Sequence, residues 1–173
     1  MAIYTLTTNL IENFPSSDKE SFGSLFHVFT NKMSGHKLAI DANKKVLGLY
    51  AEAKIDSGLK SLYKEWLEYL AGMLRFCESI SVEIDTTDKD IAFLQLASSI
   101  NGKKKIIVYS RNNCTYNCDD NNEVEYNGKQ IHVLDKDEAI SEINAKYNGD
   151  INLQQTMGNN SSIINGNQNK IKN

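Results

Sequence analysis

The segment Ile106–Ser110 (IIVYS) is the feature that most constrains the fold of this chain. It is short and continuously apolar, with three lysines before it and Arg-Asn-Asn after it. Apolar side chains on both faces of a strand are typical of parallel sheets that are covered on both sides. The segment follows a stretch whose apolar spacing predicts a helix from about residue 88, so a β-α-β unit is expected. These observations indicate the α/β class.

Two more strands are predicted upstream. Ala2–Thr8 alternates and carries β-branched residues, and His36–Asp41 is a short apolar segment of the same kind. We expect Ala2–Thr8 and Ile106–Ser110 to be central neighbours in a mostly parallel sheet, within a three-layer sandwich. Residues 80–84 are compatible with a strand or with an extended connection.

Apolar residues at helical spacing predict helices between these strands. Ser17 and Glu20 have the form of a capping box at the start of one helix. Leu59–Met73 shows a strong apolar stripe, and Thr87 is expected to cap a later helix. Further helices are predicted over residues 46–53 and 135–147.

A hairpin is predicted near the end of the domain. Asn127-Gly128 lies between two alternating segments, and a type I′ turn needs two residues with positive φ. Asn and Gly are the residues that most readily adopt this conformation.

The length of 173 residues leaves room for one ordinary domain. The chain is 40% hydrophobic and 24% charged, which is typical of a globular protein. We assign residues 1–147 to the domain and residues 148–173, which are rich in Asn and Gly, to a tail.

Charge and hydropathy exclude some classes of protein. A net charge of -3 argues against a surface built entirely for phosphate backbones, although Lys103–Lys105 leaves local contact with nucleic acid open. The first residues lack the pattern of a signal peptide, and no apolar run is long enough to span a membrane. We therefore expect a cytoplasmic protein without membrane contact.

The three cysteines are Cys77, Cys114 and Cys118. An odd number in a chain without a secretion signal predicts reduced thiols. The spacing of Cys114 and Cys118 offers half of a zinc site, to which His132 adds a third ligand, but a closed site needs four. Loop and buried thiols are the favoured interpretation.

Four segments carry a resemblance to a known family when they are taken in order. The first strand runs into Thr7-Thr8-Asn9, residues 35–50 read GHKLAIDANKKVLGLY, residues 88–97 read DKDIAFLQLA, and residues 104–113 read KKIIVYSRNN. Together they resemble the PIN-like nuclease family, in the branch found in bacterial defence and conflict loci. The likeness covers most of residues 2–146.

Members of that family gather carboxylates near the carboxyl ends of parallel strands to hold Mg²⁺ or Mn²⁺. These hard cations favour oxygen ligands, polarise the phosphodiester and activate water. Transferred residue by residue, the resemblance places the family's acids at Thr7, Leu49, Asp90 and Arg111. Only Asp90 has a carboxylate.

If this alignment is shifted by one or two residues, other acids also become candidate site residues. Asp41 ends a predicted strand, where sites of α/β proteins form. Asp90 and Asp41 are therefore the candidate catalytic residues, and Asp41, Asp88 and Asp90 the candidate metal ligands. The alternative is that Asp41, Asp85 and Asp88 are turn and cap residues, which is a common role of Asp.

The tail contains an eight-residue repeat, Gly158–Asn165 (GNNSSIIN) and Gly166–Asn173 (GNQNKIKN). Asn-rich segments of low charge and without Pro can stack in cross-β assemblies. The tail resembles the short Gly/Asn/Ile amyloid-signalling motifs of bacterial defence proteins, and the alternative is a flexible polar terminus. The candidate assembly residues are Asn159, Ile163, Asn165, Asn167 and Ile171.

Two functions follow from these features. One is a catalytically degenerate PIN-like module of a bacterial defence system, which uses no cofactor and binds a protein partner or itself through Gly149 to Asn173. The other is an endonuclease that depends on Mg²⁺ or Mn²⁺ and cleaves RNA rather than DNA. The missing carboxylates favour the first function, and the resemblance alone favours the second.

Overall fold

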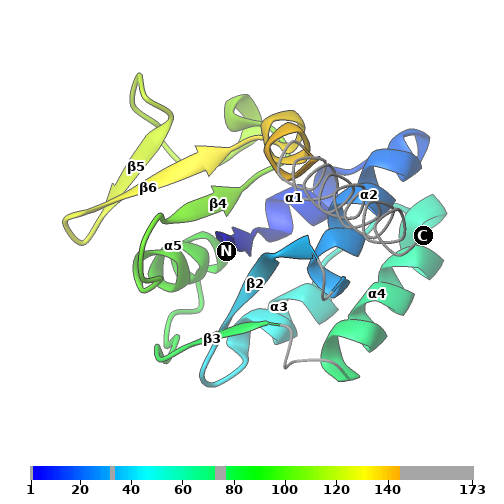
Figure 1. Ribbon diagram of the computed structural model, residues 1–173, viewed down its shortest axis with the longest axis horizontal. Helices are drawn as coiled ribbons and strands as arrows, with labels where there is room; N and C mark the ends of the chain where they lie inside the picture. The colour runs from blue at the N-terminus through cyan, green and yellow to red at the C-terminus, as the bar shows by residue number, and fades with distance from the viewer. Residues whose placement is uncertain (1, 32–33, 73–76, 145–173) are drawn as a thin grey trace, which may run out of the picture. The chain divides into compact units, whose positions relative to one another are not determined.

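The structure is a computed structural model that describes residues 2–31, 34–72 and 77–144. Within these residues, six strands form one sheet in the order β3-β2-β1-β4-β6-β5, and only the β5–β6 pair is antiparallel (Figure 1). The predicted α/β class and mostly parallel sheet are confirmed. The strands are β1 (Ala2–Leu6), β2 (His36–Asp41), β3 (Glu78–Ile80), β4 (Lys105–Ile107), β5 (Glu123–Tyr126) and β6 (Lys129–Leu134).

The predicted neighbours β1 and β4 lie side by side in the sheet. Thr5 pairs with Ile106 and Leu6 with Ile107, in parallel. Both strands are shorter than predicted. The first ends at Leu6 because Thr7 already caps the following helix.

Five α-helices have bounds within the described residues, and two predicted helix starts were wrong. Pro15 opens a 3-10 turn, η1 (Ser16–Asp18), so Ser17 and Glu20 form no capping box. The later helix is capped by Asp88 rather than by Thr87. The α-helices are α1 (Thr8–Asn13), α2 (Lys19–Thr30), α3 (Lys45–Glu52), α4 (Lys60–Gly72) and α5 (Lys89–Ser98), and two more 3-10 turns are η3 (Ser57–Leu59) and η5 (Arg111–Asn113).

Aromatic rings join α2 to α4. Phe26 packs edge-on against Trp66 at 4.7 Å between ring centroids and against Tyr63 at 6.3 Å. The Trp66 indole N–H donates a hydrogen bond to the carbonyl of Phe26 at 3.1 Å. Such edge-to-face pairs add to the free energy gained from burying the rings. The stripe predicted over residues 59–73 is therefore part of the core.

The predicted hairpin connects β5 and β6. Asn127 and Gly128 have φ values of 51° and 72°, as a type I′ turn requires. The loop before β5 folds back on this edge of the sheet, where Asp119 donates its N–H to the carbonyl of Glu123 and accepts the Glu123 N–H through Oδ1. These backbone groups of the edge strand are thus already bonded.

The chain divides into two compact units, Met1–Ile140 and Ser141–Asn173. Residues 136–144 are helical, in line with the prediction for residues 135–147. The predicted division after residue 147 and the whole tail lie outside the described residues. Within residues 2–31, 34–72 and 77–144, every helix is too short or too polar to cross a lipid bilayer.

Candidate functional site

The strand order changes direction between β1 and β4. From β1 the chain continues to β2 and β3 on one side, and β4 then begins on the other side of β1 (Figure 1). Ligands of open parallel sheets bind beyond the carboxyl ends of the strands at such a point. The residues that follow β1 and β4 are therefore the first candidates for a site.

Thr7 follows β1 directly and uses its hydroxyl twice. Oγ1 donates to the carbonyl of Ile107 at 2.9 Å and accepts the N–H of Leu10 at 3.2 Å, which caps α1. The side chain is fully buried. With its proton donated and one lone pair occupied, this hydroxyl joins β1, β4 and α1.

Asn9 bridges the two connections that leave β1 and β4. Its Oδ1 accepts the N–H of Tyr109 at 3.1 Å, and its Nδ2 donates to the carbonyl of Asn113 at 3.2 Å. The side chain, which follows β1, is therefore bonded to two backbone groups of the connection after β4.

Asp41, at the end of β2, binds the start of α3. Its two carboxylate oxygens accept the N–H groups of Lys45 at 2.7 Å and Val46 at 2.9 Å, and the side chain is buried. A carboxylate is favoured here because the first N–H groups of a helix lack backbone partners and carry partial positive charge. Asp41 has the role of a cap residue.

Asp88 has the corresponding role at α5. Its Oδ1 accepts the N–H groups of Asp90 at 2.9 Å and Ile91 at 3.1 Å. Asp85 is exposed in the connection before it. Asp90 is partly exposed, and its backbone carbonyl accepts the hydroxyl of Tyr116 at 3.1 Å.

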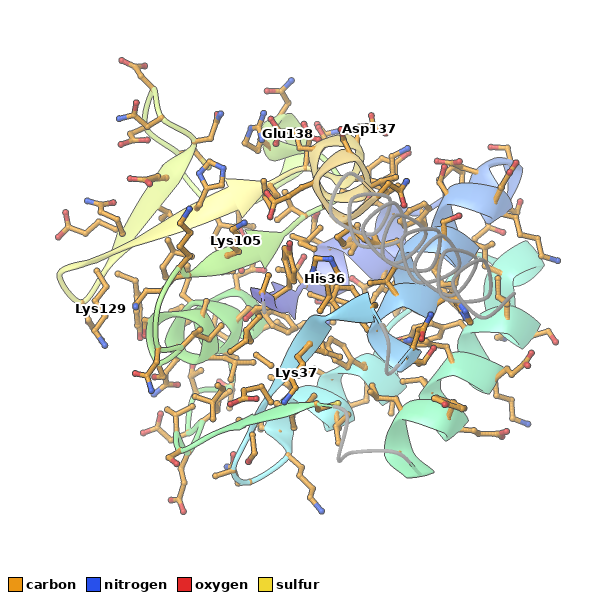
Figure 2. The ribbon with its side chains drawn as sticks, viewed as in Figure 1. His36, Lys37, Lys105, Lys129, Asp137 and Glu138 are labelled. Atoms are coloured by element: carbon orange, nitrogen blue, oxygen red, sulfur yellow. The ribbon has the colours of Figure 1, made fainter. Side chains whose placement is uncertain are left out.

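Arg111 follows β4 and lies in a network of acids. Its guanidinium forms a bidentate pair with Glu138, contacts Asp135 at 3.5 Å and donates to the carbonyl of Val133 at 3.2 Å. Figure 2 shows Glu138 beside Asp137 at the start of the helical residues that follow β6. The Arg111 pair lowers the pKa of Glu138, and Glu138 in turn raises the pKa of Arg111. A cation of the protein itself thus occupies this position.

Leu49 lies in α3 and is buried. The neighbouring Tyr50 donates its hydroxyl to the carbonyl of Leu6 at 2.8 Å, and burial raises the pKa of this phenol well above its usual value. The helix segment that the resemblance associates with an acidic residue is therefore anchored to the end of β1 by a neutral side chain.

Of the candidate ligands, Asp41 is the last residue of β2, and Asp88 and Asp90 lie at the start of α5. Two of the three carboxylates are bonded to backbone N–H groups. In the part of the chain that the structure describes, no group of three or more His, Cys, Asp or Glu residues is placed to hold a metal ion. Ligation of Mg²⁺ or Mn²⁺ by these residues stays a prediction.

The capping box that connects Arg111 to the last helical residues was missed in the sequence. The Asp135 N–H donates to Glu138 Oε2 at 3.1 Å, and the Glu138 N–H donates to Asp135 Oδ1 at 3.0 Å. The sequence does contain the pattern that predicts such a box. An acid is followed three residues later by Glu, ahead of the apolar residues Ala139 and Ile140.

Lys103, Lys104 and Lys105, just before and at the start of β4, lie at the opposite, amino edge of the sheet. Lys104 donates to the carbonyls of Ile100 at 2.9 Å and Gly102 at 3.2 Å, just after the carboxyl end of α5. The Nζ of Lys105 lies 5.4 Å from the ring centroid of Tyr4, near His36 (Figure 2). Only Lys103 of the three is exposed.

A groove of about 300 Å³ lies between α2 and α4. Four of its nine lining residues are Phe, Trp or Tyr, and Glu65 is the acidic residue among them. No sequence pattern predicted a site there. Its lining residues are Phe22, Gly23, Phe26, His27, Thr30, Leu62, Glu65, Trp66 and Tyr69.

The chain matches no protein-family model, no curated protein and no solved structure with which it was compared.

Proposed function

We propose that the chain is a PIN-like α/β module that has lost metal-dependent cleavage and acts by binding. Its ligand is a protein partner, or a second copy of the chain, and the binding segment is Gly149 to Asn173. The observation that carries the proposal is the set of side chains at the four positions where the resemblance calls for acids. Of Thr7, Leu49, Asp90 and Arg111, only Asp90 has a carboxylate.

The contacts of these side chains support the loss of catalysis. The Thr7 hydroxyl is occupied by Ile107 and Leu10, and Leu49 is buried. The guanidinium of Arg111 repels a divalent cation, and its pairing with Glu138 removes a nearby carboxylate from the possible ligands. Too few hard ligands remain to localise Mg²⁺ or Mn²⁺.

The proposal includes the three-layer arrangement of the family and a role in a bacterial defence or conflict system. In support of the layers, Phe29 of α2 contacts Tyr4 of β1 at 5.8 Å between ring centroids. Helix α5 packs on β1, β4 and β6. The sandwich requires these two helices to cover opposite faces of the sheet.

A nuclease assay on the full-length protein tests the loss of catalysis. Single-stranded RNA and DNA are incubated with Mn²⁺ or Mg²⁺, beside samples that contain a chelator. We expect no cleavage above the chelated control. Metal-dependent cleavage that disappears in Asp90→Ala, while Asp85→Ala keeps it, would falsify the proposal.

The endonuclease alternative is favoured by one specific observation. Asp90 is partly exposed at the start of α5, beyond the carboxyl ends of the strands, where a site of this architecture is expected. In that case Asp90 is a metal ligand and RNA the favoured substrate. Asp41→Ala is a poor test of this alternative, because Asp41 also caps α3.

Assembly through the tail is tested separately, by sedimentation velocity over a range of concentrations. We expect the full-length protein to assemble and Ile163→Asp with Ile171→Asp to stay monomeric, because the stack would bury both charges. Asn160→Asp with Gln168→Glu is the matched control, since it adds the same charge beside the Ile positions. A full-length protein that stays monomeric throughout would contradict this part of the proposal.

A further inference from the structure

The loop between η5 and β5 brings two thiols to one oxygen atom. Sγ of Cys114 lies 3.7 Å and Sγ of Cys118 lies 3.8 Å from the carbonyl oxygen of Tyr116. Both are within hydrogen-bonding distance for sulfur. The separation of the two sulfur atoms is therefore at most the sum of these distances, and rotation about the side-chain bonds of either residue can shorten it.

The two loop thiols are more accessible than the third cysteine. Cys114 and Cys118 are partly exposed, whereas Cys77 is buried with 8% of its surface accessible. Burial also raises the pKa of Cys77 to about 11. Burial raises the pKa of Cys118 too, so the difference rests on access: Cys77 is the buried thiol, and we expect it to react more slowly than the two loop thiols.

The same loop is fastened at the carboxyl edge of the sheet. The Cys114 thiol also lies 3.3 Å from the carbonyl of Arg111, and the Tyr116 hydroxyl reaches the carbonyl of Asp90. These contacts attach the loop to η5 and to the start of α5, and the shared carbonyl of Tyr116 places the two thiols near each other. An intramolecular reaction between them is thus favoured over reaction with a second molecule.

We propose that Cys114 and Cys118 form a dithiol that low-molecular-weight disulfides, such as glutathione disulfide, oxidise to an intramolecular disulfide. One thiol loses its proton and attacks glutathione disulfide, which forms a mixed disulfide and releases one glutathione. The second thiolate then attacks the protein sulfur of the mixed disulfide and releases the second glutathione. Two protein thiols are oxidised, and one glutathione disulfide is reduced to two glutathiones.

Formation of the disulfide between Cys114 and Cys118 changes the loop locally. It removes the thiol protons that contact the carbonyls of Arg111 and Tyr116, and ties the ends of the five-residue segment 114–118 to each other. The segment holds Tyr116, whose hydroxyl is bound at the start of α5. Oxidation therefore acts on the contact between this loop and α5, and the inference does not depend on the proposed function.

The test exposes the folded full-length protein to glutathione disulfide, blocks remaining thiols by alkylation and analyses tryptic peptides by mass spectrometry. Cleavage after Arg111 and Lys129 leaves both cysteines in one peptide. We expect this peptide to lose two hydrogen atoms while Cys77 remains a thiol. Cys77→Ser, the matched control, should behave as the wild type does.

The single variants Cys114→Ser and Cys118→Ser separate the formation of the mixed disulfide from its conversion to the intramolecular disulfide. Each variant should accumulate a mixed disulfide with glutathione at the remaining loop cysteine, because the resolving thiol is absent. The wild type should show no such adduct at equilibrium. Two stable glutathione adducts on the wild-type peptide, unreacted thiols, or a disulfide to Cys77 or between chains would overturn the proposal.

Discussion

Asp41 accepts two backbone N–H groups of α3 from a buried position. Asp41→Ala leaves both donors without this acceptor, and we expect the free energy of unfolding to fall by about 1–3 kcal/mol. Urea denaturation measures the loss. Asp85→Ala is the matched control at an exposed site, where a change within about 0.5 kcal/mol is expected. Equal stability of the two variants would show that the cap contributes nothing.

The pair of Arg111 and Glu138 predicts a dependence of stability on pH. The pKa of Glu138 is lower in the folded state than its unfolded value of about 4.3. The pair therefore stabilises the protein above that pH, and the contribution is lost as the pH falls through the lowered pKa. We expect Arg111→Met to be less stable than the wild type at pH 7, with a gap that narrows under acid conditions.

Urea denaturation at a series of pH values checks this expectation. Lys64→Met is the control, because Lys64 and Glu68 form an exposed pair at 3.8 Å, and such pairs contribute little. A gap for Arg111→Met that does not narrow as the pH falls below the unfolded Glu value of about 4.3 would assign the effect to lost packing of the Arg stem, because the ion pair then contributes no pH-dependent stability.

Single residues also show what the sequence could reveal about the site. The sequence offered two roles for Asp41, a metal ligand and a cap, and its contacts are those of a cap. The partners of Thr7 and Arg111 were not predictable, because Ile107 and Glu138 are distant in sequence. Only the folded sheet brings them together.

Gly48 lies in α3, and a Cβ atom built there has no neighbour within 4 Å. Ala restricts the unfolded chain and favours the helix, so Gly48→Ala should raise the free energy of unfolding by about 0.5–1 kcal/mol. Thermal denaturation followed by circular dichroism measures the change. No gain, or a loss, would show that α3 is not a regular helix at this position.

At Gly58 in η3 the opposite effect of a Gly→Ala substitution on stability is expected. A Cβ atom there would lie 2.4 Å from the Cβ of Ser16, so the backbone of one turn must move. Gly58→Ala should lower the free energy of unfolding by about 1–3 kcal/mol, as overpacking does elsewhere. Its stability at or above that of the wild type would contradict the close approach of η1 and η3.

The elements were predicted best where local chemistry decides them. The pair Asn127-Gly128 correctly predicted the hairpin, and β2 has the predicted bounds, His36–Asp41. The helix starts at Ser17 and Thr87 were missed because neighbouring residues, Pro15 and Asp88, form the competing turn and cap. The position of β6 between β4 and β5 depends on pairing across the sheet, which no local pattern reports.

Deleting Gly149 to Asn173 should leave a cooperatively folded domain. Among the residues that the structure describes, the fully buried aromatic side chains, from Tyr4 to Phe93, lie in the first compact unit, Met1–Ile140. We expect the deletion variant to melt in one transition, at the temperature of the full-length protein at a concentration where the latter is monomeric. Multiphasic melting, or a much lower temperature, would show that the tail contributes to the domain.

Trp66 is the single tryptophan of a chain with eight tyrosines. It is 6% exposed, its indole N–H is bonded to Phe26, and its ring stacks on Tyr63. The emission of this one indole therefore reports the contact between α2 and α4, whereas circular dichroism averages over the chain. The two optical signals should change together when the domain unfolds as one unit. If α4 detaches before the rest of the domain unfolds, the Trp66 emission will change before the circular dichroism signal does. Trp66 emission then reports the local opening.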